Sequence, residues 1–148
     1  MKRIASLVAA GVCLLASTSC TGVGLPGGIF GGLLACNPGT QVQLANPAPN
    51  QGGVSSNIGQ ITIVANGNSN TLYSTYAQWQ FTLVDNFNNQ MTSGTLNLVP
   101  DPSGPHPYAS DFYYQSSISP MTAGRTWNVE LVQNGNSCTP ASVGSFST

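Results

Sequence analysis

The chain has 148 residues, which is the size of a single domain with one hydrophobic core. Charged residues make up only 5% of it, against about 25% in an average soluble domain. The cations are Lys2, Arg3 and Arg125, so removal of the N-terminal end would leave one cation beside four carboxylates. One cation cannot form a basic surface, which excludes nucleic-acid binding through phosphates and a polybasic membrane patch.

Residues 1–19 have the pattern of a signal peptide. Two basic residues precede an apolar run over 4–16, which is too short to span a bilayer, and small residues then lead to Cys20. A cysteine in this place resembles a bacterial lipoprotein signal, in which that cysteine carries the lipid. The lipoprotein pattern prefers Leu where this chain has Ser17. We expect lipidation of Cys20; the alternative is ordinary cleavage and a secreted protein with a Cys20 thiol.

The cysteine count agrees with a lipid on Cys20. Cys13 lies inside the apolar run and leaves with the signal, so three cysteines remain in an exported chain. If Cys20 carries lipid, the remaining pair is Cys36 and Cys138, which we expect to form a disulfide in an oxidising compartment. Without a Cys-x-x-Cys motif and with His106 as the one histidine, no zinc site is expected.

Residues 20–35 predict a tether between the anchor and the domain. Six of the fifteen residues in 21–35 are glycine, which disfavours a helix and favours a flexible linker. The alternative is that its apolar residues, such as Ile29 and Phe30, lie against the membrane or the domain surface.

From residue 36 onward, apolar residues recur with a period of two, and Gly, Pro and Asn separate the runs. No sustained period of 3.6 is present, so no helix is expected. Polar turns are expected at 85–90 and at the proline-rich segment 101–107. Two alternating runs supply the expected core: Trp79, Phe81, Leu83, Trp127, Val129 and Leu131. Seven strands are predicted in all: 40–44, 60–64, 78–83, 95–99, 112–118, 126–132 and 143–147.

Three segments resemble fibronectin type III and bacterial Ig-like domains. Residues 121–129 (MTAGRTWNV) resemble the turn into strand F, residues 143–148 (VGSFST) the closing strand G, and residues 47–54 (PAPNQGGV) the proline-rich entry. The family usually has Tyr where Trp127 stands, so the tyrosine corner is not preserved as such. The resemblance implies an all-β, Ig-like seven-stranded antiparallel β-sandwich over 36–148, and it implies no activity.

The resemblance also bears on the disulfide. In such a sandwich the first and last strands begin at the same pole. Cys36 precedes the first expected strand, and Cys138 lies in the connection between the last two. The bridge would therefore tie the chain ends together instead of crossing the core, and it would place the tether at that pole.

Catalytic chemistry has little support in the sequence. A hydrolase would need His106 beside an Asp and a Ser, but a histidine in a proline-rich loop is more often a surface residue. Asp85 and Asp101 stand in expected turns, and Asp111 and Glu130 at strand edges or outward positions, so nothing brings two of them together as a glycosidase pair. No cofactor is expected.

Exposed tyrosines suggest the alternative of a binding role. The candidates are Tyr73, Tyr76, Tyr108 and Tyr113, since rings beside amide side chains can stack on a sugar or a protein. Ordinary packing is the more common role of such residues. Tyr113 and Tyr114 should point to opposite faces of a strand, so we expect one of them to be exposed.

The sequence thus predicts a signal peptide over 1–19, a lipid-anchored tether over 20–35 and an Ig-like domain over 36–148. We expect a non-enzymatic module of the cell envelope with a structural or protein-binding role. Its expected partners are the membrane, through the lipid, and an envelope protein or glycan. A carbohydrate-binding or adhesive module is the alternative, and a hydrolase a more distant one.

Overall fold

The structure is a computed structural model that describes residues 34–67, 71–100 and 106–148. All of them belong to a compact unit formed by Gly32–Thr148. The expected signal peptide, the lipidation site Cys20, most of the tether and Asp101 lie outside the described residues. Among the described helices, none has the length and hydropathy needed to cross a membrane.

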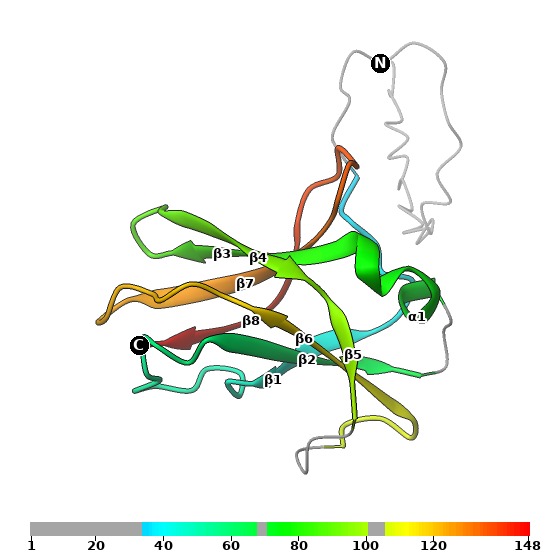
Figure 1. Cartoon of the computed structure of the whole chain (residues 1–148), viewed down its shortest axis with the longest axis horizontal. Helices are drawn as coiled ribbons and strands as arrows, with labels where there is room; N and C mark the ends of the chain where they lie inside the picture. Colours follow the sequence, from blue (N-terminus) through cyan, green and yellow to red (C-terminus); the bar gives the residue numbers. More distant parts are fainter. Residues whose placement is uncertain (1–33, 68–70, 101–105) are drawn as a thin grey trace, which may run out of the picture. The chain divides into compact units, whose positions relative to one another are not determined.

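The described chain folds into two four-stranded antiparallel sheets, which form an all-β sandwich (Figure 1). The strand orders are β1-β2-β6-β5 in one sheet and β4-β3-β7-β8 in the other. The elements are β1 (Val42–Asn46), β2 (Gln60–Asn66), α1 (Thr71–Thr75), the 3-10 helix η1 (Tyr76–Gln78), β3 (Trp79–Asp85), β4 (Gln90–Thr95), β5 (Asn97–Val99), β6 (Asp111–Ser117), β7 (Thr126–Gln133) and β8 (Ala141–Ser147).

The predicted core is confirmed. On β3 and β7, every second side chain is buried, and the six residues expected inside are each 3% exposed or less. The two strands pair in register, with Phe81 opposite Leu131 and Leu83 opposite Val129. The alternating pattern therefore directs both apolar faces into the space between the sheets.

Each predicted strand corresponds to an observed one, but the structure adds β4, an eighth strand. Its sequence, QMTSGT, contains one large apolar residue, Met91, because the strand lies at the edge of its sheet and buries little. The expected turn at 85–90 is shorter than predicted, since Asp85 still belongs to β3 and Gln90 begins β4.

The expectation that the domain contains no helix is wrong. Thr71–Thr75 forms one helical turn, which is too short to show a period of 3.6 in the sequence. Leu72 packs into the core, while the hydroxyls of Ser74 and Thr75 donate to the Thr71 carbonyl at 3.0 and 2.7 Å. This turn and η1 carry the chain from one sheet to the other.

Candidate functional site

The four candidate tyrosines are divided between the two faces of β6. Tyr73 on α1 is 44% exposed, and its ring centroid lies 5.0 Å from that of Phe112. Tyr76 on η1 is half-buried, with its ring 5.7 Å from that of Tyr114 in the core. Burial, with the nearby phenols of Tyr73 and Tyr76, raises the pKa of Tyr114 to about 12.

Tyr113 and Tyr108 lie on the outer face of the same sheet. With Ala45, Val64 and Val99 they form a small apolar cluster separate from the main core. The expectation that Tyr113 or Tyr114 is exposed is wrong: they are 2% and 1% exposed, respectively. The two side chains point to opposite faces of the sheet, as expected. Tyr113 is buried nevertheless, because it belongs to the small apolar cluster on the outer face. Burial and the Asp111 carboxylate raise the pKa of Tyr108.

A cleft of about 360 Å³ is lined by residues of β5, by Pro100 and by the first residues of β6. Its volume is at the lower end of the range of small-molecule sites. Apolar atoms dominate its wall, and Asp111 supplies a carboxylate. Its lining residues are Leu98, Val99, Pro100, Asp111, Phe112 and Tyr113. Of the four candidate tyrosines, Tyr113 lines the cleft, and Tyr73 contacts Phe112, which is another lining residue.

His106 lies beside this cleft and contacts Asp111. Its Nδ1 is 3.1 Å from Asp111 Oδ2 and 3.3 Å from the Tyr113 hydroxyl. The Tyr108 N–H donates to the other carboxylate oxygen at 3.2 Å. The His106 side chain is 54% exposed, whereas that of Asp111 is 5% exposed. A histidine, a carboxylate and the Tyr113 phenol therefore meet beside the cleft.

The described residues contain no group of three or more His, Cys, Asp or Glu side chains that could hold a metal ion. Asp85 is engaged in its own turn: Oδ1 accepts from the N–H groups of Phe87 and Asn89, each at 2.8 Å. Glu130 accepts a hydrogen bond from the Asn128 side chain at 2.9 Å. The described carboxylates thus stabilise local structure.

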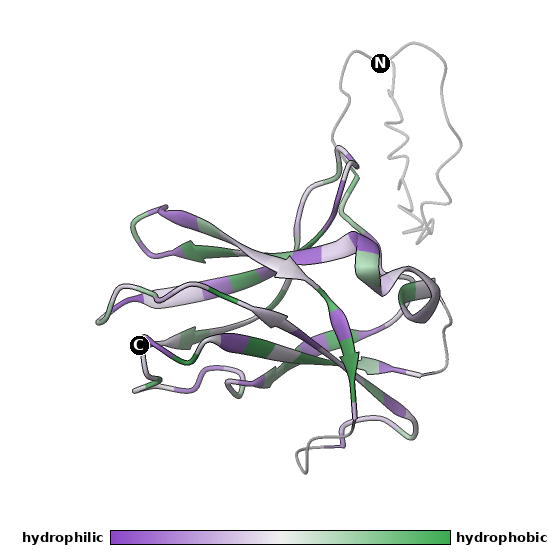
Figure 2. Ribbon diagram, in the orientation of Figure 1, coloured by the Kyte–Doolittle hydropathy of each residue, from purple (hydrophilic) through white to green (hydrophobic). Residues whose placement is uncertain are grey.

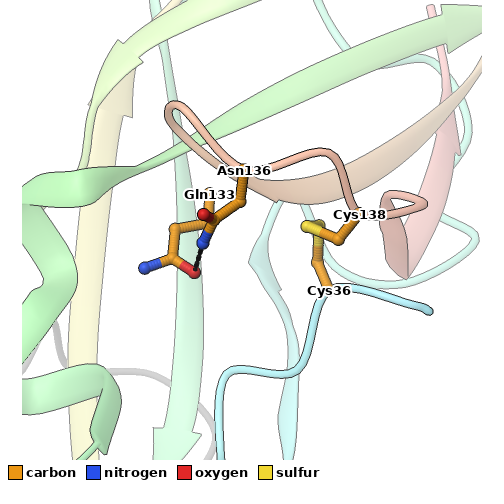
Figure 3. Close-up of a disulfide and its surroundings, with 4 residues drawn as sticks. All are labelled: Cys36, Gln133, Asn136 and Cys138. Carbon is orange, nitrogen blue, oxygen red and sulfur yellow. Dashed lines mark hydrogen bonds between the residues drawn. A yellow bond between two sulfur atoms is a disulfide. The ribbon is translucent and has the colours of Figure 1, made fainter. Parts of the chain in front are cut away.

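The predicted disulfide between Cys36 and Cys138 is present, with the two Cα atoms 5.0 Å apart (Figure 3). Cys138 lies in the connection between β7 and β8, and the segment that leads into β1 runs beside this connection in Figure 1. Two main-chain hydrogen bonds support the contact. The Cys36 N–H donates to the Thr139 carbonyl at 2.7 Å, and the Thr139 N–H donates to the Leu34 carbonyl at 3.0 Å.

The same end of the sandwich carries the cleft. Asn66 at the end of β2 faces Asp111 at the start of β6, and Trp79 at the start of β3 faces Gln133 at the end of β7. The connection from β2 to β3 therefore joins two strand ends: the end of the first sheet that carries the cleft and the end of the second sheet that lies next to the disulfide.

The opposite end carries a group that sequence reasoning missed. Phe87, in the turn between β3 and β4, is 63% exposed, and the Arg125 guanidinium lies 3.8 Å from the centre of its ring. Arg125 Nε is also 3.9 Å from Asp85 Oδ2. Burial on its own would raise the pKa of Asp85. Its hydrogen bonds to Asn89 and Phe87, with Arg125 nearby, instead lower that pKa below its usual value.

No match to the chain was found among protein-family models, curated proteins or solved structures. Arguments about function therefore depend on the residues and their geometry. The sequence contained one signal that could have identified the cleft, namely the aromatic run from Phe112 to Tyr114. It contained none for Leu98 and Pro100, which join the cleft because β5 pairs with β6.

Proposed function

We propose that this chain is an exported, lipid-anchored module of the cell envelope with an Ig-like fold and a structural or protein-binding role, without catalytic activity. The disulfide between Cys36 and Cys138 carries this proposal. Disulfides persist in oxidising compartments, and Cys36 is the first residue of the proposed domain.

The strand order supports an Ig-like fold. Immunoglobulin constant-type domains place strands A, B, E and D in one sheet and C, F and G in the other. With strands assigned in chain order, β1-β2-β6-β5 corresponds to A-B-E-D, and β3-β7-β8 corresponds to C-F-G. β4 is then an additional strand beside C.

The anchoring proposal has a direct chemical test. The chain is produced in a bacterial host with its own N-terminus, and intact and non-reduced peptide masses are measured. We expect a diacylglyceryl mass on Cys20 and a linked Cys36–Cys138 peptide pair. The Cys20→Ser variant serves as the control and should move from the membrane fraction to the soluble fraction. An unmodified Cys20 in the mature protein would overturn the anchor and favour a secreted protein.

Carbohydrate binding is a second candidate, and the Tyr73–Phe112 pair beside the cleft favours it. The exposed Tyr73 ring offers a face for a sugar, and Phe112 continues this aromatic surface to the wall of the cleft. Titration calorimetry with soluble chito- and cello-oligosaccharides tests this candidate. Tyr73→Ala should abolish binding, whereas Phe87→Ala, which removes an exposed ring at the other end, should not. Absence of binding, or equal loss in both variants, would refute it.

A further inference from the structure

The chain contains two Asn-Gly pairs, Asn66-Gly67 and Asn134-Gly135, in different surroundings. In such a pair the main-chain nitrogen of the glycine can attack the side-chain amide of the asparagine, because glycine has no side chain to hinder the approach. The attack requires a glycine N–H that is free of other bonds and a main chain that can bring the two atoms together. The reactivity of each pair therefore depends on how firmly the fold holds its peptide bond.

The peptide bond between Asn66 and Gly67 is held on both sides. The Gly67 N–H donates to the Ser110 carbonyl at 2.7 Å, and the Asn66 carbonyl accepts from Thr40 Oγ1, also at 2.7 Å. Asn66 is half-buried at the end of β2, where it pairs with Asp111 of β6. The space beside Gly67 is filled, since a Cβ built on it would lie 2.5 Å from Ser110 Oγ. The nitrogen that would attack is thus bonded and fixed in place.

The peptide bond between Asn134 and Gly135 is free by comparison. The pair forms the exposed turn after β7, in the connection to β8 that projects from the sandwich in Figure 1 and is partly coloured as hydrophilic in Figure 2. Within the part of the chain that the structure describes, the Asn134 carbonyl, its side-chain amide and the Gly135 N–H have no hydrogen-bond partner. A Cβ built on Gly135 would meet no atom within 4 Å.

The turn itself is closed by one long hydrogen bond. The Asn136 N–H donates to the Gln133 carbonyl at 3.3 Å, which is beyond the usual range for such bonds. The Asn134 N–H donates to the Gln78 carbonyl at 2.7 Å, so the main chain is fixed on the β7 side of Asn134 and not within the Asn-Gly pair. The two atoms that would react, Asn134 Cγ and the Gly135 nitrogen, can therefore approach each other without loss of a strand pairing.

We propose that Asn134 is a site of spontaneous deamidation, whereas Asn66 keeps its amide. The Gly135 nitrogen bonds to Asn134 Cγ and gives up its proton, and the amide nitrogen leaves with that proton as ammonia, which closes a cyclic imide. Water then opens the ring. Cleavage between the ring nitrogen and Cγ gives aspartate, and cleavage between the ring nitrogen and the main-chain carbonyl carbon gives isoaspartate. The reaction takes up water, releases ammonia and involves no oxidant or cofactor.

The products would change the connection that carries the disulfide. Both add a carboxylate, and the one Lys or Arg among the described residues, Arg125, lies at the opposite end of the sandwich. In isoaspartate the main chain also runs through the former side chain and is longer by a carbon. The main-chain and side-chain hydrogen bonds from Asn136 to Gln133 span this turn, the latter shown in Figure 3, so the longer chain would disturb both. Cys138 lies in the same connection.

Trypsin separates the two sites, so both can be followed in one sample of the full-length protein. Between Arg3 and the C-terminal residue, Arg125 is the one cleavage point, and the reduced digest therefore gives a peptide that contains Asn66 and a second peptide, 126–148, that contains Asn134. Deamidation raises the mass of a peptide by the difference between OH and NH2. In folded protein kept at mildly alkaline pH, peptide 126–148 should gain this mass at least about tenfold faster, because Asn66 reacts only after local opening of β2.

The reduced protein in guanidinium chloride is the matched control. Without the fold the two Asn-Gly pairs should react at similar rates, so unfolding should accelerate Asn66 far more than Asn134. Asn134→Gln, whose longer side chain closes the ring poorly, should remove the mass gain from peptide 126–148. Equal rates at the two sites in the folded protein, or fragment masses that place the change at Asn136 instead of Asn134, would overturn the proposal.

The predicted effect on the turn has its own measurement. Anion exchange separates the aged forms, and the isoaspartate form should melt at a lower temperature than the parent. The Asn134→Asp variant adds the same charge with an ordinary main chain, and as an exposed substitution it should melt close to the parent. An isoaspartate form that melts with the parent would refute the predicted disturbance of the turn.

Discussion

Removal of the Cys36–Cys138 disulfide should lower the free energy of unfolding by about 4–5 kcal/mol. The perturbation is the double variant Cys36→Ala/Cys138→Ala. The Cys36 side chain is buried and that of Cys138 half-buried, so alanine leaves little unsatisfied polarity. The main-chain bonds between Cys36 and Thr139 and between Thr139 and Leu34 stay in place. The native geometry is therefore preserved, and the loss should arise mainly in the unfolded chain.

The magnitude follows from the length of the loop. The two cysteines are 102 positions apart, so the bridge closes most of the domain. The chain-entropy model assigns a loop of this length about 4.7 kcal/mol. Because typical domains are stable by about 5–15 kcal/mol, the variant should be only marginally folded.

Urea unfolding followed by tryptophan fluorescence measures the effect, since Trp79 and Trp127 are both buried. The m value should increase in the variant, because its unfolded chain exposes more surface without the cross-link. Ser137→Ala, an exposed change in the same loop, is the matched control and should alter stability by less than about 0.5 kcal/mol. A loss below about 1 kcal/mol in the double variant, with an unchanged m value, would refute the loop-closure reasoning.

Three further predictions concern the core, a close contact between the two sheets and a turn. Phe81→Ala should cost about 3–5 kcal/mol in thermal or urea unfolding, because the side chain is fully buried; a cost below about 1 kcal/mol would contradict its place in the core. Gly144→Ala should lower the free energy of unfolding by about 1–3 kcal/mol, because the new Cβ would lie 2.8 Å from Leu44 Cβ and the residue has a φ of +148°. A variant as stable as the parent would show that the two sheets can move apart here without a loss of stability. Asp85→Asn should destabilise the domain at neutral pH and converge with the parent in acid, as followed by melting temperature against pH. Because the pKa of Asp85 is lower in the folded protein, the carboxylate stabilises the fold at pH values above its unfolded-state pKa of about 4. This stabilisation is lost as the pH falls through the folded-state pKa. A difference in melting temperature that stays constant at all pH values would exclude the charge of Asp85 as the source of the stabilisation.

The alternating pattern was sufficient for the main layers of the fold. Strands that are buried on one face and central in a sheet, such as β3 and β7, show a period of two because each second residue enters the core. The disulfide pair was also predicted, but the cysteine count led to it only on the assumption that Cys20 carries lipid. β4 escaped prediction because an edge strand with both faces largely exposed has no apolar period to detect.

The candidate site was less predictable, because its composition depends on packing between distant segments. Whether Tyr113 is exposed depends on Ala45, Val64 and Val99, which meet only once β1, β2, β5 and β6 are paired. The Tyr73–Phe112 pair joins α1 to β6 across almost forty residues. No local pattern reports such contacts, and so the tyrosines that were grouped by sequence are separated in space.

The way residues 50–54 and Cys36 meet the last strands has a consequence for biosynthesis. Gln51 pairs beside Phe146, and Cys36 pairs with Cys138, so segments made early must wait for segments made near residue 140. A nascent chain that ends before β7 can pair β3 with β4, but it lacks β7 and β8, which form the other half of that sheet. Non-local pairing of this kind is slow to form. The domain should therefore stay unfolded while it is translated, and folding should begin only after nearly all of it has left the ribosome.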